Sequence, residues 1–265
     1  MTEAPIDIPL TEYLEFARHL ARQAGEISLK YFRGRFEVET KHDQSPVTIA
    51  DRETEQFVRE RIIERFPDHG ILGEEYGEIN AGARMRWIVD PIDGTKSFVK
   101  GVPLYTLLLA LEIDGEAHVG VIHNPALGET VCGATGLGAT CNGMPCRVNR
   151  TERLEEAWVM STDYADLAQA RPAFTTELLA TARSARTWAD AYGYVLVATG
   201  RADVMIDAEM NLWDMAALKP IVQEAGGRFT DLEGQNTIHS DSGLAANGVL
   251  HEQVLEMAKR GCDSK

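Results

Sequence analysis

Apolar residues near the start of the chain follow helical spacing, whereas those further along gather in short runs. The first apolar stripe predicts a helix that Thr11 caps and that runs to about Phe32. A second helix is expected to start at Asp51 and to stop before Pro67, because proline cannot donate the hydrogen bond of a helix interior. The chain therefore opens with two amphipathic helices.

Short apolar runs after the second helix predict strands. Ile71-Leu72 forms one such run, and Trp87–Val89 forms the next. Between Thr106 and Ile122 two apolar runs flank Asp114-Gly115, a strong turn signal that predicts a hairpin. Further strand-like segments lie on either side of a second turn signal, Asn-Gly: Thr130–Ala134 and Cys146–Val148. The first half is thus expected to pack helices on a sheet rich in antiparallel pairs.

The second half alternates strands with helices. The expected strands are Ala157–Met160, Asp203–Asp207, Arg228–Thr230 and Leu244–Ala246. The expected helices are Phe174–Ala182, Ala191–Ala198, Trp213–Ala225 and one that begins at Glu252. This alternation is typical of α/β units. We therefore expect an N-terminal α+β half over residues 1–148 and a C-terminal α/β half over residues 149–265.

Composition narrows the range of partners. The 265 residues carry a formal net charge of -15, which argues against the nucleic-acid backbone as a partner. No apolar run approaches the roughly 18 residues that a membrane span needs. The segment from Met1 to Leu10 lacks the pattern of a secretion signal, and the four cysteines lack the spacing of zinc or redox sites. We expect a reduced, cytoplasmic protein.

Two aspartates directly follow the run Trp87–Val89. Asp90 and Asp93 flank Pro91, and Gly94-Thr95 comes next. Burying carboxylates costs free energy that a cation readily offsets, and oxygen ligands suit hard ions such as Mg²⁺. A Gly-Thr pair can begin a helix, whose free N–H groups bind phosphate. A metal and a phosphate together indicate phosphoryl chemistry.

Three other acidic positions stand out, and each has an ordinary explanation. Asp51 and Asp214 suit helix N-termini as caps or dipole partners, and Glu74-Glu75 suits a surface loop. Strand ends of one sheet converge at a common edge, so these carboxylates are also placed to meet Asp90 and Asp93 around a pair of metal ions. Spacing alone leaves both interpretations open.

Four segments resemble, in order and spacing, the signature motifs of the inositol monophosphatase superfamily: Gly73-Glu74-Glu75, Asp90-Pro91-Ile92-Asp93-Gly94-Thr95, Trp213-Asp214-Met215-Ala216-Ala217 and Glu224-Ala225-Gly226-Gly227. The likeness covers essentially the whole chain. It implies a layered αβαβα sandwich, an α/β (α+β) fold of the inositol monophosphatase and fructose-1,6-bisphosphatase type. It also implies a homodimer and Mg²⁺-dependent hydrolysis of a small phosphorylated substrate, by direct attack of water.

The same resemblance implies the metal ligands. Glu74, Asp90 and the main-chain carbonyl of Ile92 would hold one Mg²⁺. Asp90, Asp93 and Asp214 would hold a second. The expected number of ions is two or three per subunit.

Catalytic roles follow from the resemblance as well. Glu74 would reach a third, weaker ion, with Asp51 in its outer shell and Lys41 nearby. Thr95 would assist Glu74 in orienting and deprotonating the attacking water, which gives an expected catalytic set of Glu74, Thr95, Asp51 and Lys41. The expected phosphate-binding residues are Asp93, Gly94 and Thr95.

The segment from Thr187 to Tyr194 departs from the inositol-type pattern and is similar to the histidinol-phosphatase branch of the superfamily. Histidinol phosphate carries an ammonium and an imidazole, so its pocket should offer carboxylates and flat apolar surface. The expected substrate contacts are Asp190, Trp188, Tyr192, Asp207, Glu209 and Asn211. Core packing of the aromatic residues and helix capping by Asp190 are the ordinary alternatives.

A histidinol-phosphate phosphatase of histidine biosynthesis is therefore the favoured function. Within the same class the alternatives are an inositol-1-monophosphatase and a broad sugar-phosphate phosphatase. Outside that class, a non-catalytic regulatory protein that keeps the fold is the alternative. The four carboxylates Glu74, Asp90, Asp93 and Asp214 weigh against it, since a chain without metal has little reason to retain them.

Overall fold

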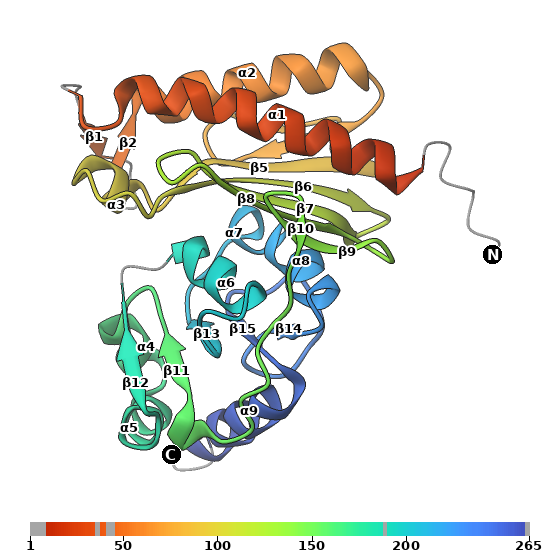
Figure 1. The fold of residues 1–265 in the computed structure, drawn as a ribbon. Coiled ribbons are helices and arrows are strands. Elements are labelled where there is room, and N and C mark those ends of the chain that lie inside the picture. Colours follow the sequence, from red (N-terminus) through yellow and green to blue (C-terminus); the bar gives the residue numbers. More distant parts are fainter. Residues whose placement is uncertain (1–8, 35–37, 41–45, 188–189, 263–265) are drawn as a thin grey trace.

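Alternating layers of helix and sheet make up the molecule (Figure 1). The computed structural model describes residues 9–34, 38–40, 46–187 and 190–262. Two sheets, of eight and five strands, alternate with three helical layers. The first helical layer consists of α1 (Leu10–Tyr31) and α2 (Ile49–Arg65). The middle layer consists of α6 (Asp190–Ala198), α7 (Leu212–Met215) and α8 (Leu218–Glu224). The last layer consists of α4 (Tyr164–Ala170), α5 (Pro172–Thr181) and α9 (Gly248–Cys262). This is the αβαβα architecture that the motifs imply.

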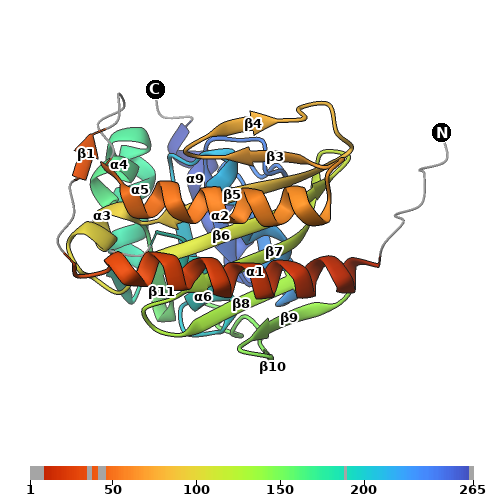
Figure 2. The same ribbon diagram turned by 90° about the horizontal axis from the view of Figure 1, so that it is seen from above.

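Helices α1 and α2 lie side by side across the outer face of the eight-stranded sheet (Figure 2). Helix α1 begins at Leu10 after Pro9, and no side-chain hydrogen bond caps it among the described residues. The prediction that Thr11 is its cap is therefore wrong. Helix α2 is capped by Thr48, while Asp51 lies in its first turn and accepts a hydrogen bond from the Thr48 amide at 2.8 Å.

The eight-stranded sheet has the order β10-β9-β8-β7-β6-β5-β3-β4. Strands β3 and β5 pair in parallel, and the other neighbours pair antiparallel. The bounds are β3 Gly70–Gly73, β4 Gly77–Ile79, β5 Met85–Asp93, β6 Thr106–Ile113, β7 Glu116–Asn124, β8 Glu129–Ala134, β9 Gly138–Cys141 and β10 Met144–Pro145. The strand predicted at Cys146–Val148 does not form, because the Val148 amide donates instead to the carbonyl of Ala225 at 3.0 Å.

The five-stranded sheet has the order β12-β11-β13-β15-β14. Its bounds are β11 Trp158–Met160, β12 Ser184–Arg186, β13 Val204–Asp207, β14 Arg228–Thr230 and β15 Gly243–Ala246. Strand β11 is parallel to β12 and β13, whereas β15 is antiparallel to β13 and β14. The single helix predicted over Trp213–Ala225 is divided into α7 and α8, because Pro220 cannot donate to a carbonyl one turn earlier. The last helix begins at Gly248 rather than Glu252.

The remaining elements are short. They are the pair β1 (Val38–Thr40) and β2 (Pro46–Thr48), the helix α3 (Thr95–Val99) and the 3₁₀ turn η1 (Leu154–Glu156). Within the described residues, no helix is both long enough and apolar enough to cross a membrane.

The middle helices sit directly on the eight-stranded sheet. A Cβ atom added at Gly120, in β7, would lie 2.2 Å from the main-chain oxygen of Ala217, so only glycine allows this approach. Apolar residues of α6 and α8 share one core with the inner faces of both sheets. Because α7 also contacts β5, this packing brings Asp214 towards the strand that carries Asp90.

Candidate active site

Strand β5 ends in two aspartates that follow a buried apolar run. The Asp90 side chain is buried, and its Oδ1 accepts a hydrogen bond from the Ile92 amide at 3.0 Å. In a regular strand Asp90 and Asp93 would point to opposite faces, because side chains alternate. The register against β6 shifts between these two residues, as at a β-bulge, which re-aims one of them.

Asp214 joins these aspartates from the other half of the chain. One carboxylate oxygen from each of Asp90, Asp93 and Asp214 lies within 4.8 Å of the other two. The Asp214 Oδ2 atom accepts hydrogen bonds from the Asn211 amide at 2.6 Å and from Asn211 Nδ2 at 3.3 Å. These bonds fix the carboxylate at the start of α7. The three side chains form a group that is able to hold a metal ion.

Burial and mutual repulsion raise the pKa of the carboxyl groups in this cluster. Burial contributes most to the raised pKa of Asp90, followed by the charges of Glu74, Asp93 and Asp214. Burial likewise raises the pKa of Asp214 to about 7, and Glu74 adds to the shift. A set of carboxylates that repel one another in this way is stabilised by a cation.

Glu74 and Asp51 border the three aspartates. Glu74 follows β3, and its amide donates to the Val89 carbonyl of β5 at 3.2 Å. Asp51 is 1% exposed, and its Oδ2 accepts hydrogen bonds from the Thr48 amide and hydroxyl. Its other oxygen, Oδ1, has no hydrogen-bond partner in the part of the chain that the structure describes. The three aspartates offer only oxygen ligands, which hard divalent cations prefer. Asp51 Oδ1 could accept a hydrogen bond from a water molecule bound to such an ion.

A glycine turn connects β5 to α3. Gly94 adopts a φ of 78°, the left-handed region that favours glycine. The Thr95 hydroxyl donates to the Ile92 carbonyl at 3.0 Å, and the Phe98 amide donates to the Gly94 carbonyl. The amides of Gly94 and Thr95 precede this first helical hydrogen bond and are available to an anion. The turn is the place at which the sequence predicts a phosphate.

A cavity of about 130 Å³ lies beside the cluster. It is lined by Asp93, Thr162, Asp190, Ala191, Tyr194, Asp207, Glu209, Met210 and Asp214. Three of the predicted substrate residues, Asp190, Asp207 and Glu209, therefore meet here. The Ala191 amide donates to Asp93 Oδ2 at 2.8 Å, which ties the start of α6 to the cluster.

Neutral donors contact two of the carboxylates that line the cavity, Asp190 and Asp207. Asp190 Oδ2 lies 3.4 Å from the Ser97 hydroxyl, and burial raises the pKa of Asp190 while Ser97 and Lys96 oppose the shift. Asp207 accepts hydrogen bonds from the Thr162 amide at 2.9 Å and from the Tyr194 hydroxyl at 3.0 Å. Asp190 also borders a second cavity of about 260 Å³, which Lys96 lines.

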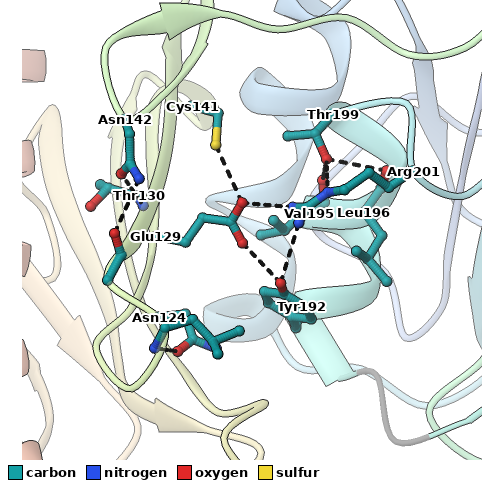
Figure 3. A network of polar contacts seen from close by, with 12 residues as sticks. Asn124, Glu129, Thr130, Cys141, Asn142, Tyr192, Val195, Leu196, Thr199 and Arg201 are labelled. Atoms are coloured by element: carbon teal, nitrogen blue, oxygen red, sulfur yellow. Dashed lines mark hydrogen bonds and ion pairs between the residues drawn. The ribbon is translucent and has the colours of Figure 1, made fainter.

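Four predicted site residues lie elsewhere or outside the described residues. The Tyr192 hydroxyl donates to Glu129, and Tyr192 does not line the cavity (Figure 3). Asn211 is exposed and contacts Asp214, so it orients a carboxylate of the cluster. Lys41 and Trp188 fall outside the residues that the structure describes.

Thr106, Ser97 and Thr162 contact site carboxylates, although no motif marks them. The Thr106 hydroxyl donates to Asp93 Oδ2 at 3.2 Å, because the first residue of β6 pairs with the last residue of β5. The register between β5 and β6 sets this contact, and no local sequence pattern indicates it. Thr162 is the second residue after β11, and it lines the same cavity as the carboxylates.

A largely shielded group of oxygen ligands at a strand end, next to a turn that begins with glycine and leads into a helix, defines a phosphomonoesterase in this layered fold. The chain matches the model of the inositol monophosphatase family over residues 9–261 and belongs to that family.

Individual relatives agree with this assignment. The chain is 41% identical over 257 residues to the histidinol-phosphatase of Chlorobaculum parvum, a match that covers 95% of this chain and 98% of the relative. It is 38% identical over 255 residues to the histidinol-phosphatase of Mycobacterium tuberculosis, covering 94% and 98%. Among solved structures, the IMPase of Thermotoga maritima matches with a TM-score of 0.87 and 34% identity, over 95% of this chain and 98% of that one.

Replacing Asp90 should remove the stabilisation that a divalent cation provides. In the wild-type protein, Mg²⁺ at about 100 times its Kd should raise the free energy of unfolding by about 2.7 kcal/mol, because bound ions offset the carboxylate repulsion. Asp90→Asn should lose most of this gain while its metal-free form stays at least as stable as the wild type. Thermal unfolding with chelator and with Mg²⁺ measures both quantities.

The matched control is Asp68→Asn, which removes an exposed carboxylate away from the cluster. It should keep the full Mg²⁺ effect. An equal Mg²⁺ effect in Asp90→Asn and wild type would contradict the assignment of this metal site.

Proposed function

We propose that the protein is a Mg²⁺-dependent histidinol-phosphate phosphatase, which converts L-histidinol phosphate and water to L-histidinol and phosphate in histidine biosynthesis. The observation that carries the proposal is the cavity beside the metal cluster, where Asp190, Asp207 and Glu209 add carboxylates that no metal ligand set requires. The names of the two bacterial relatives support the same substrate. We also propose a cytoplasmic homodimer, in line with the family resemblance.

The metal ligands in this proposal are Glu74, Asp90, the Ile92 carbonyl, Asp93 and Asp214, which would hold two Mg²⁺ ions, with a third near Glu74. The Ile92 carbonyl accepts a hydrogen bond from the Thr95 hydroxyl, and its second lone pair is left for an ion. When bound, Mg²⁺ supplies Lewis-acid chemistry that activates water and offsets charge on the phosphate oxygens.

The chain's own groups then position and deprotonate the nucleophile. The Thr95 hydroxyl, held 3.0 Å from the Ile92 carbonyl, would orient the attacking water, and Glu74 would accept its proton. The amides of Gly94 and Thr95 would bind the phosphate oxygens as charge builds up on them. Asp51, with one oxygen not hydrogen-bonded within the described residues, would support the outer hydration shell of the weaker ion.

Substrate choice follows from the charge of the leaving group. The ammonium of histidinol phosphate would face Asp190, with Asp207 and Glu209 adding negative potential in the same cavity. Where water is largely excluded, a carboxylate paired with an ammonium contributes more than one paired with a neutral hydroxyl. The hydroxyls of an inositol phosphate would bring no cation to this negative potential.

Inositol 1-phosphate, or a broader set of sugar phosphates, is the alternative substrate. The Thermotoga maritima structure, described as an IMPase, superimposes on this chain with a TM-score of 0.87, so the scaffold itself is compatible with either substrate. The residues that line the cavity, rather than the fold, would determine which of the two substrates is preferred.

Histidinol phosphate should be hydrolysed with a kcat/KM at least about tenfold above that of inositol 1-phosphate, since one charge-assisted contact is worth roughly 1.5–3 kcal/mol. Steady-state phosphate release from both esters, under the same Mg²⁺ concentration, measures the ratio. Equal or reversed values would overturn the proposed substrate.

Asp190→Asn should reduce kcat/KM for histidinol phosphate by about tenfold or more and leave inositol 1-phosphate nearly unchanged, because only the cationic ester loses an ion pair. The backbone should tolerate the change, since Asp190 has a φ of 41° and asparagine accepts this region. Steady-state kinetics on both esters give the comparison.

Asp166→Asn is the matched control, because it removes an exposed carboxylate that lines the second cavity but not the cavity beside the metal cluster. It should leave both esters unchanged. An equal loss on both esters in Asp190→Asn would show that Asp190 does not select the substrate.

A further inference from the structure

Helix α6 carries two tyrosines that bond carboxylates in different sheets. The Tyr192 hydroxyl donates to Glu129 Oε2 at 2.8 Å, and Glu129 opens β8 of the eight-stranded sheet. The Tyr194 hydroxyl donates to Asp207 Oδ2 at 3.0 Å, and Asp207 ends β13 of the five-stranded sheet. Residues two apart in a helix lie roughly 200° apart around its axis. The two bonds therefore hold α6 from opposite sides.

Glu129 contacts one residue within α6 and one that follows the helix, Tyr192 and Arg201 (Figure 3). Its Oε2 accepts the bond from Tyr192, near the start of the helix, and its Oε1 accepts a bond from Arg201 Nη2 at 2.8 Å, just after the helix ends. The Arg201 guanidinium lies 5.8 Å from the centre of the Tyr192 ring and also donates to the Thr199 hydroxyl at 2.8 Å. Cys141 adds a long contact of 3.4 Å to Oε1.

Glu129 and Tyr192 are largely shielded from water, whereas Arg201 is exposed. The Glu129 side chain is only 16% exposed, and Tyr192 is buried. Charge-assisted hydrogen bonds are stronger than neutral ones, and a largely buried carboxylate oxygen that loses its donor is left poorly solvated even while Arg201 stays paired with the other oxygen. Removal of the Tyr192 hydroxyl should therefore loosen the start of α6.

The start of α6 is the part of the helix that reaches the active site. The Ala191 amide donates to Asp93 Oδ2 at 2.8 Å, immediately before Tyr192. A Cβ added at Gly94 would lie 2.9 Å from Asp190 Oδ2, so Asp190 rests against the predicted phosphate turn. A small rotation of α6 about its axis would move the Ala191 amide away from Asp93 and the Asp190 carboxylate away from Gly94.

We propose that Glu129 is a positioning residue: by holding Tyr192 and Arg201 it fixes the rotation of α6, and thereby keeps Asp190 in place to select a cationic substrate. Neither Glu129 nor Tyr192 lines the cavity, so their influence passes through the helix. The part that concerns substrate selection rests on the proposed function, whereas the part that concerns the helix does not.

Tyr192→Phe tests the proposal by removing one hydroxyl and keeping the ring. Hydrogen exchange of the amides in residues 190–198 should become about tenfold faster, because loss of a charge-assisted bond favours local opening. The KM for histidinol phosphate should rise by about tenfold with kcat little changed, while kcat/KM for inositol 1-phosphate stays within about twofold. Glu129→Gln should show the same pattern.

Cys141→Ala is the control on the same carboxylate, since it removes only the long thiol contact and should leave exchange and kinetics unchanged. Unchanged exchange over residues 190–198 in both Tyr192→Phe and Glu129→Gln would overturn the proposal. Faster exchange with an equal loss on both esters would overturn the selective role. If the wild type released no phosphate from histidinol phosphate, the proposed function would fail, and the exchange rates alone would support or overturn the positioning of α6.

Discussion

Repulsion among one buried and two half-buried carboxylates, where the end of β5 meets α7, is the constraint on which the rest of the structure depends. Asp90, Asp93 and Asp214 bring oxygens within 4.8 Å of one another, and Glu74 adds its charge to theirs. Each carboxylate is fixed by its own donors, such as the Ile92 amide for Asp90. A rigid set of this kind costs stability when empty and is pre-organised for a cation. The fold is therefore destabilised at the same place where a bound cation would act in the reaction.

Both halves of the chain must pack for this cluster to exist. Asp214 lies on α7, and the Ala191 amide of α6 donates a hydrogen bond to Asp93. The close approach of Gly120 to the Ala217 carbonyl sets the depth of the middle helices against the sheet. In the proposed positioning, the hydrogen bond between Tyr192 and Glu129 sets the rotation of α6. On this account, metal binding and substrate selection depend on contacts made away from the reacting phosphate.

Local features of the site could be predicted from the sequence, whereas contacts between layers could not. The apolar run before Asp90 and the turn at Gly94 are local patterns, and both appear in the structure as expected. Two tyrosines two residues apart look equivalent in a sequence, because nothing local tells which sheet each side of α6 will face. The division between α7 and α8 is different, because Pro220 is a local signal within an otherwise continuous apolar pattern. Thr106, in contrast, reaches Asp93 through the register between β5 and β6, which depends on tertiary packing rather than on spacing.

Phosphate release from histidinol phosphate, followed first with Mg²⁺ and then with a chelator, most directly tests the claim that the carboxylate cluster is the metal site of a phosphatase. The account predicts steady release with Mg²⁺, arrest on chelation and recovery when Mg²⁺ is restored in excess. The same rate with chelator would contradict the role of the cluster. No release from this ester or from any other phosphomonoester with Mg²⁺ would contradict catalysis itself and favour a regulatory protein that keeps the fold.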